Sequence, residues 1–343
     1  MKMAIYGLGA MGMRIVQSFL EKKIPIAFIV DRQKAGTFFE GVPVISLEHV
    51  TFDLAEDTNL LVALHNHYVD LKTLHSELAP LKFKSIITLA GLWKLFPQIE
   101  VEGGYWLQAQ TDRDEHRSKC EEFLNLLSDD KSIHLAKSIL KFRTSGSLED
   151  YPYPSMSDEY APVDLPRYSE PIRLIDCGAY TGTAIHRFLQ AGYAVDAVAA
   201  FEPDPESFRK LSANDFPIAE KQFFPMGTWS VKRQFRFSNK GSMASNIDPL
   251  GSSTIDCVAI DEVLSAFHPN LIKLDVEGAE FDTLIGARNI ISSDLPSLCI
   301  SIYHSAEDFY RLGLLIHSWG LNYKFYLRLH EHNTFGAVLY CRQ

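Results

Sequence analysis

The sequence predicts an α/β protein with two doubly wound domains, and two observations support this prediction. Short β-rich runs alternate with helical patterns in the N-terminal part, and a second series of the same kind begins near residue 173. Each series opens with a strand that leads into a glycine-rich turn, AIYGLGAMG at residues 4–12 and IRLIDCGAYTG at residues 172–182. A chain of 343 residues is long enough for two domains of ordinary size.

The domain boundaries follow the changes in sequence pattern. We expect a first domain at residues 1–110, a connecting segment at 111–170 and a second domain at 171–343. The second domain ends in YKFYLRLH and TFGAVLYCR, which are separated by a short polar turn and predict an antiparallel hairpin.

The composition restricts the class of protein. The chain is 46% hydrophobic and 22% charged, as soluble globular proteins are, and its formal net charge of −10 argues against a nucleic-acid partner. No apolar run is long enough to span a membrane, and the first residues lack the pattern of a signal peptide. Five scattered cysteines without C-x-x-C spacing fit reduced thiols, so we expect a cytoplasmic protein.

The first glycine turn has the form of a Rossmann-like nucleotide site. Gly7, Gly9 and Gly12 match G-x-G-x-x-G between a strand and a helix, and Asp31 follows the next strand 19 residues after Gly12 (31 − 12). In this motif the glycines make the turn, admit a pyrophosphate and let the helix pack closely, and the acid holds a ribose. The alternative is a scaffold of the same fold that binds no ligand.

The connecting segment contains a helix and a strap. Apolar residues recur at helical spacing in SDDKSIHLAKSILKFRTSG, and Gly146 is expected to end that helix. The following YPYPSMSDEYAPVDLPRYSEP is rich in Pro, Tyr and Ser, and we interpret it as an ordered strap that lies over a site.

The second glycine turn differs from the first because its acid precedes the glycines. Asp176, Gly178 and Gly182 are spaced D-x-G-x-x-x-G, an order that suits a nucleoside with an amino-acid end, since the carboxylate can face an ammonium group. Glu202 follows the next strand, where a carboxylate can accept both ribose hydroxyls, and Asp204 before Pro205 is expected to cap a helix. This set is what S-adenosylmethionine requires. Further candidate cofactor contacts are Ala179, Tyr180, Gly227 at the end of the third strand, and Asp275.

These motifs carry a family resemblance. LIDCGAYTG, AFEPDP, IKLDVEGAE, SIYHSAEDFYRL and the closing LRLHEHN…VLYCR together resemble the FkbM family of S-adenosylmethionine-dependent methyltransferases. GGYWLQ, LLSDDKS and LHNHYVDLKTL resemble the preceding segments of two-domain members, so the resemblance covers most of the chain. It implies a class I methyltransferase domain with a seven-stranded sheet from about residue 171 onward, which methylates hydroxyls of sugars or secondary metabolites.

Three acidic or basic side chains at strand ends are candidates for catalysis. Asp275 and Glu277 lie two residues apart at the end of one strand, and His304 ends another, where open α/β sheets bind ligands. His304 is the preferred general base because a histidine titrates near neutral pH. Glu280 is interpreted as a charge at a helix N-terminus. No ligand spacing supports a metal site, and metal dependence stays undecided.

Two alternatives to a methyltransferase stay open. An NAD(P)-dependent oxidoreductase would use the first turn, and a non-catalytic scaffold would hold a nucleotide-sugar there. The complete second nucleotide-type fold argues against the oxidoreductase. We expect a small-molecule or saccharide acceptor, S-adenosylmethionine as cofactor and a second nucleotide as a hypothesis for the first turn. The sequence does not determine the acceptor's identity or the oligomeric state.

Overall fold

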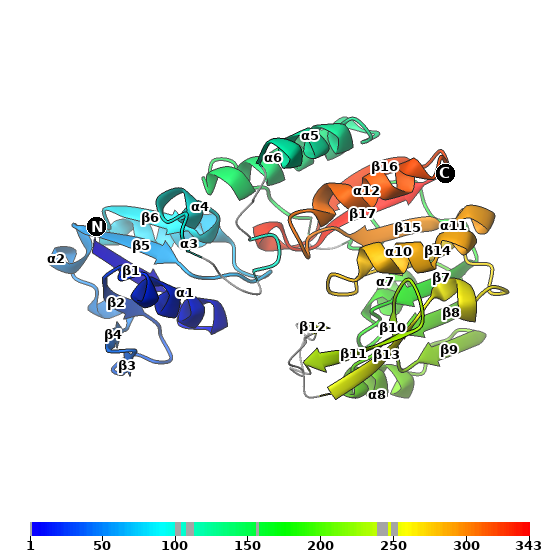
Figure 1. Ribbon diagram of the computed structural model, residues 1–343, viewed down its shortest axis with the longest axis horizontal. Coiled ribbons are helices and arrows are strands. Elements are labelled where there is room, and N and C mark those ends of the chain that lie inside the picture. Colours follow the sequence, from blue (N-terminus) through cyan, green and yellow to red (C-terminus); the bar gives the residue numbers. More distant parts are fainter. Residues whose placement is uncertain (1, 100–103, 108–112, 156–157, 239–245, 248–252) are drawn as a thin grey trace. The chain divides into compact units, whose positions relative to one another are not determined.

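The protein consists of two compact units in the computed structural model (Figure 1). The structure describes residues 2–99, 104–107, 113–155, 158–238, 246–247 and 253–343, so parts of GGYWLQ and of the strap lie outside the described residues. Unit 1 comprises Met1–Asp114, His134–Pro154 and Glu331–Phe335. Unit 2 comprises Glu115–Ile133, Ser155–His330 and Gly336–Gln343.

Unit 1 is built on a six-stranded sheet in the order β3-β4-β2-β1-β5-β6. Its strands are β1 (Lys2–Tyr6), β2 (Ile26–Val30), β3 (Phe38–Phe39), β4 (Val42–Ile45), β5 (Thr58–Val62) and β6 (Ser85–Thr88). All neighbouring strands are parallel except β3 and β4. Because the chain order reverses between β1 and β5, the turn after β1 lies at the switch point where such sheets bind ligands.

The helices of unit 1 bury apolar faces on this sheet. They are α1 (Ala10–Glu21), α2 (Phe52–Ala55), α3 (Leu71–Leu78) and α4 (Leu89–Leu95). In α1, Ile15, Val16 and Phe19 are fully buried at helical spacing. Two further helices, α5 (Arg113–Leu124) and α6 (Asp130–Ser145), belong to the connecting segment. Gly146 ends α6 as expected, with a φ of 65° and its N–H donated to the Phe142 carbonyl oxygen at 2.8 Å.

Unit 2 is built on a seven-stranded sheet in the order β16-β17-β15-β14-β7-β8-β9, which confirms the predicted fold class (Figure 1). Its strands are β7 (Ile172–Cys177), β8 (Val195–Phe201), β9 (Glu220–Phe224), β14 (Leu271–Leu274), β15 (Ser297–Ser301), β16 (Lys324–Leu329) and β17 (Ala337–Arg342). β7, β8, β9, β14 and β15 are parallel, and β16 and β17 form the antiparallel hairpin that the sequence predicted.

A smaller sheet in unit 2 differs from the sequence prediction. The run IDCVAIDEVL lies within the second α/β series of the sequence, but its first residues belong to β13 (Ser253–Val258). This strand is part of a separate four-stranded sheet with β10 (Gly227–Thr228), β11 (Arg233–Ser238) and β12 (Asn246–Ile247). β11 pairs antiparallel with β13, so a hairpin-like pairing replaces the expected crossover. Gly227 therefore begins a strand of the small sheet instead of ending the third strand of the main sheet, which is β9.

Six helices of the described part of unit 2 connect these strands. They are α7 (Thr183–Gln190), α8 (Pro205–Ala213), α9 (Ile260–Val263), α10 (Glu280–Gly286), α11 (Arg288–Asp294) and α12 (Asp308–Ser318). Asp204 caps α8 as predicted, since its carboxylate accepts the Ser207 N–H at 2.9 Å. Among the described residues, no helix is long and apolar enough to cross a membrane.

Candidate functional site

The candidate site lies where four parallel strands of unit 2 end. Asp176 is the second-last residue of β7, Glu202 follows β8, Asp275 follows β14, and His304 comes three residues after β15. These strands are neighbours in the order β15-β14-β7-β8, and the carboxyl ends of parallel strands lie at one edge. The sheet therefore brings together at this edge four residues that the sequence predicted for the site.

The turn after β7 is shaped by two glycines with positive φ. A Cβ atom on Gly178, whose φ is 75°, would lie 1.8 Å from the Asp275 carbonyl oxygen. Gly182, with a φ of 86°, precedes α7, and a Cβ there would lie 2.5 Å from the Phe216 ring. The N–H groups of Gly178 and Ala179 donate to the Phe201 carbonyl oxygen at 3.0 and 2.9 Å, which ties the turn to β8. Only glycine fits at either position.

Glu202 connects the turn to the end of β8. Its Oε2 accepts the N–H of Tyr180 at 2.7 Å, and its Oε1 accepts the N–H of Asp204 at 2.8 Å. The side chain is buried at the strand edge, and this burial raises the pKa of Glu202 to about 7. The carboxyl group therefore titrates near neutral pH, and a ligand that donates to its charged form would hold it ionised.

Asp176 has a partner that the sequence analysis missed. Its carboxylate is fully buried, and Oδ1 lies 3.1 Å from Nζ of Lys273 on the adjacent strand β14. The Lys273 ammonium also donates to the Gly178 carbonyl oxygen at 2.7 Å. A cation of this chain thus contacts the carboxylate that we expected to face a ligand ammonium. The sequence feature that could have indicated this partner is the single lysine in the apolar strand LIKL, which pairs in register with Asp176.

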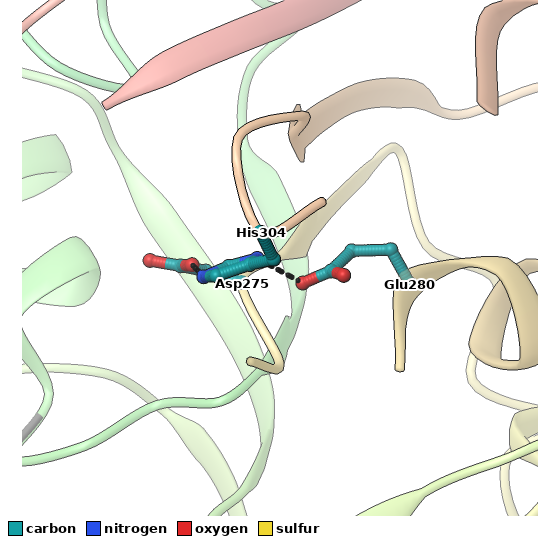
Figure 2. A group of neighbouring side chains, drawn as sticks. All are labelled: Asp275, Glu280 and His304. Atoms are coloured by element: carbon teal, nitrogen blue, oxygen red, sulfur yellow. Dashed lines mark ion pairs between the residues drawn. The ribbon is translucent and has the colours of Figure 1, made fainter. Parts of the chain in front are cut away.

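Asp275, Glu280 and His304 form a cluster (Figure 2). His304 Nδ1 lies 2.9 Å from Glu280 Oε1, and His304 Nε2 lies 3.5 Å from Asp275 Oδ1 and 3.8 Å from Glu277 Oε2. Glu280 is completely buried and also accepts the N–H groups of Val276 and Gly278, at 2.8 and 3.1 Å. Glu280 therefore does more than place a charge at the start of α10, as the sequence had suggested, because it fixes both the loop and the imidazole.

The charges around His304 determine its protonation. Burial would lower the pKa of His304, but Glu280, Glu277 and Asp275 raise it to about 10. The imidazole is then protonated at neutral pH, and an imidazolium cannot accept a proton. Burial would likewise raise the pKa of Asp275, but Lys273 and His304 hold it below its usual value, so Asp275 is a carboxylate. At neutral pH the unprotonated member of this pair is therefore Asp275 and not His304, which the sequence analysis preferred as general base.

The same cluster also offers metal ligands. One ligand atom each of Asp275, Glu280 and His304 lies within 4.8 Å of the other two. A metal would compete with the proton on His304, because only the neutral imidazole binds a metal.

A second group missed by the sequence analysis comes from the strap. The Tyr160 hydroxyl donates to Asp275 Oδ2 at 2.9 Å, and the Tyr303 hydroxyl lies 3.4 Å from Oδ1. The strap thus reaches the candidate site, as expected, through a hydrogen bond between residues 115 positions apart in the sequence. Gly227, by contrast, packs in the small sheet, where a Cβ would lie 2.8 Å from Cys257 Sγ.

The glycine turn of unit 1 has the geometry expected of its motif. Gly7 has a φ of 94°, and a Cβ on Gly12 would lie 2.0 Å from the Gly7 carbonyl oxygen. A Cβ on Gly9 would meet no atom within 4 Å, and the φ of Gly9 is −75°, so neither backbone nor packing requires glycine there. Asp31 Oδ2 accepts the N–H of Leu8 at 2.8 Å. Asp31 thus holds the turn itself.

Comparisons with known proteins address the identity of unit 2. Residues 176–325 match the family model described as the methyltransferase FkbM domain, which confirms the resemblance of the motifs. The hexuronic acid methyltransferase AglP of Haloferax volcanii is 30% identical over 110 residues, which cover 28% of this chain and 43% of AglP. The chain thus spans less than half the length of that relative.

A solved structure extends the similarity in fold to both units. The crystal structure of methyltransferase FkbM from Methylobacillus flagellatus KT matches with a TM-score of 0.80 and 22% identity. The match covers 99% of this chain and 90% of the other. At this identity the match concerns the fold alone.

Proposed function

We propose that this protein, whose residues 176–325 match the family model of the methyltransferase FkbM domain, is an S-adenosylmethionine-dependent methyltransferase that methylates a hydroxyl group of a saccharide. The observation that carries the proposal is the set of acidic side chains at the ends of β7, β8 and β14 within the matched segment. An enzyme with this function needs groups that hold the cofactor and a group that takes the proton of the acceptor hydroxyl.

Glu202 and the turn after β7 fit the adenosyl end of the cofactor. A carboxylate offers about four acceptor positions, and the backbone N–H groups of Tyr180 and Asp204 use two of those on Glu202. The remaining positions suit the two hydroxyls of a ribose. Gly178 and Ala179 keep the turn against β8 beside this carboxylate.

For the amino-acid end of the cofactor we propose a partner other than Asp176. Since the Lys273 ammonium already contacts Asp176, we assign the cofactor ammonium to the partly exposed carboxylate of Glu277. Asp176 then acts through Lys273, which holds the carbonyl oxygen of Gly178 and thereby the turn. This assignment avoids placing the cofactor ammonium on the carboxylate that the Lys273 ammonium already contacts.

Asp275 is the proposed proton acceptor. S-adenosylmethionine supplies an electrophilic methyl group, and the acceptor oxygen becomes strongly acidic as it bonds to that carbon. Even a carboxylate with a low pKa can therefore take the proton. His304, held protonated between Asp275 and Glu280, is proposed to keep the carboxylate ionised and oriented.

The acceptor class is suggested by a relative. AglP is described as a hexuronic acid methyltransferase, and it is 30% identical to this chain over 110 residues. We infer a saccharide acceptor for this chain from that similarity. Secondary-metabolite hydroxyls are the alternative that an acceptor screen must include.

Calorimetry tests whether the protein binds the proposed cofactor. S-adenosylmethionine and S-adenosylhomocysteine should bind the wild-type protein, and Glu202→Ala should weaken both by about tenfold or more, since hydrogen bonds to a charged group are lost. Glu206→Ala is the matched control, because Glu206 is an exposed residue of α8 that pairs only with Lys210 among the described residues. Binding of NAD or NADP in the same titrations would test the second nucleotide hypothesis for unit 1. A protein that binds NAD but neither adenosyl ligand contradicts the proposed function.

An acceptor screen tests the reaction. Labelled methyl transfer to saccharides and to hydroxylated secondary metabolites should identify acceptors, and Asp275→Asn should lose turnover but keep binding of S-adenosylhomocysteine. Full turnover in Asp275→Asn would show that another group takes the proton.

A further inference from the structure

Tyr160 has an unusual backbone conformation in the strap. Its φ is 66°, in the left-handed region that bulky residues rarely adopt, and its side chain is buried. All of its polar groups are bonded. Its N–H donates to the Tyr340 hydroxyl at 2.9 Å, its carbonyl oxygen accepts the Tyr168 hydroxyl, and its own hydroxyl donates to Asp275. Such strain persists only where the surroundings fix it, and it is concentrated at functional sites.

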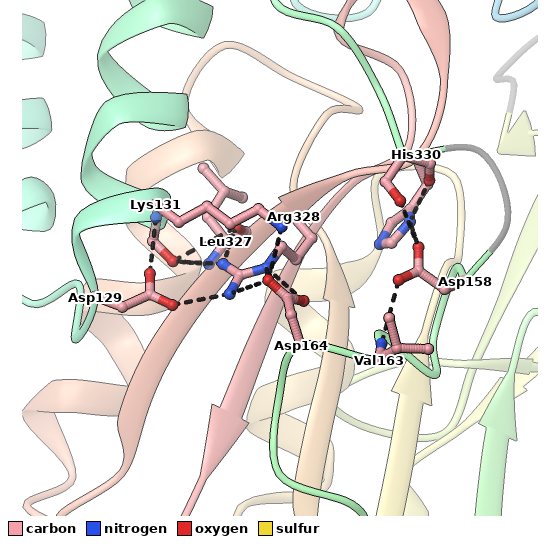
Figure 3. A network of polar contacts seen from close by, with 10 residues as sticks. Asp129, Lys131, Asp158, Val163, Asp164, Leu327, Arg328 and His330 are labelled. Carbon is pink, nitrogen blue, oxygen red and sulfur yellow. Dashed lines mark hydrogen bonds and ion pairs between the residues drawn. The ribbon is translucent and has the colours of Figure 1, made fainter.

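The strap is anchored on both sides of Tyr160 (Figure 3). Before it, Asp158 accepts from Ser155 and from the Val163 N–H, and lies 3.5 Å from Nδ1 of His330. After it, the two oxygens of Asp164 lie 3.1 and 3.0 Å from Nε of Arg328, a buried residue of β16. The C-terminal hairpin thus holds the segment that presents Tyr160.

A series of buried hydrogen bonds connects the C-terminal hairpin to Tyr160. Nε2 of His330 lies 2.8 Å from the Tyr340 hydroxyl, which in turn accepts the Tyr160 N–H. The Tyr160 ring lies 5.5 Å from the Lys273 ammonium, so the side chain also covers the cation that holds Asp176. Tyr160 therefore contacts Asp275 through its hydroxyl and lies beside the lysine that contacts Asp176.

We propose that Tyr160 is a positioning residue for methyl transfer, whose hydroxyl fixes the Asp275 carboxylate toward the acceptor. The proposal rests on the proposed function. Tyr160 holds Oδ2 of Asp275, and Tyr303 and His304 lie against Oδ1, so the carboxylate is fixed from two directions. Burial keeps the pKa of Tyr160 well above its usual value, so its hydroxyl stays a hydrogen donor.

Tyr160→Phe isolates this contact. The substitution removes one hydroxyl and keeps the ring that packs in the core and lies beside Lys273. We expect kcat to fall by about tenfold or more, since a hydrogen bond to a charged group is lost, with KM and the affinity for S-adenosylhomocysteine unchanged. Tyr323→Phe is the matched control, because its buried hydroxyl donates to the Pro296 carbonyl oxygen and not to the site.

A double-mutant cycle separates positioning from a structural role. In the Asp275→Asn background, Tyr160→Phe should cause little further loss of kcat, because its effect acts through Asp275. An equal loss in both backgrounds, an unchanged kcat in the single variant, or a fall in ligand affinity that matches the fall in kcat would overturn the proposal. If the wild-type protein binds S-adenosylhomocysteine and transfers methyl groups, these outcomes concern Tyr160 alone. A wild type that does neither overturns the proposed function as well.

Discussion

Gly178→Ala tests whether the cofactor turn and the strand that bears Asp275 form one rigid unit. Gly178 has a φ of 75°, and an added Cβ would lie 1.8 Å from the Asp275 carbonyl oxygen. Gly192 has nearly the same φ, 76°, but an added Cβ would meet nothing within 4 Å. The two alanine variants therefore share the backbone strain and differ in the clash, which makes Gly192→Ala a matched control.

The expected losses of unfolding free energy follow from the backbone strain and from the clash. The left-handed conformation costs an alanine about 1–2 kcal/mol, and overpacking costs about 1–3 kcal/mol more. We therefore expect Gly192→Ala to lower the free energy of unfolding by about 1–2 kcal/mol and Gly178→Ala by about 2–5 kcal/mol. Urea unfolding measures both. Because the Asp275 backbone must move, Gly178→Ala should also weaken binding of S-adenosylhomocysteine in calorimetry. Equal destabilisation by the two variants would refute the close approach on which the site is built.

Three further predictions concern titration and the first glycine turn. Since burial raises the pKa of Glu202 to about 7, calorimetric affinity for S-adenosylhomocysteine should increase from about pH 6 to about pH 8 as the carboxylate forms, and Glu202→Gln should abolish the increase. Since the pKa of His304 is raised from 6.5 to about 10, the protonated imidazole stabilises the fold fully below pH 6.5, and this contribution is lost as pH rises through about 10. The difference in unfolding free energy between the wild type and His304→Gln should shrink over that range, and a constant difference would mean a neutral imidazole. Gly9→Ala should leave thermal stability unchanged, because an added Cβ there meets no atom within 4 Å. Gly12→Ala should disrupt unit 1, because its added Cβ would lie 2.0 Å from the Gly7 carbonyl oxygen. Loss of stability in Gly9→Ala would show that the chain itself needs the space at Gly9.

The sequence determined the fold class because its local patterns repeat. Strands of the main sheets, the G-x-G-x-x-G turn, the cap at Asp204 and the final hairpin could each be predicted from a few neighbouring residues. The acids at strand ends were also found, because parallel strands place their carboxyl ends at one edge. The small sheet was missed because apolar runs of similar length do not show which strand will be their partner.

Only the tertiary structure decided what those acids contact. Lys273 forms an ion pair with Asp176 because β14 pairs with β7 in a register that places these two residues, 97 positions apart (273 − 176), opposite each other. Tyr160 belongs to a strap without periodicity and reaches Asp275 only in the fold, and Glu280 orients a histidine that follows another strand. Protonation depends on such contacts, since burial and neighbouring charges outweigh the ordinary pKa of each side chain. The sequence by itself therefore identified which residues lie at the edge of the sheet, and the packing of distant segments decided which of them is charged, held or free to react.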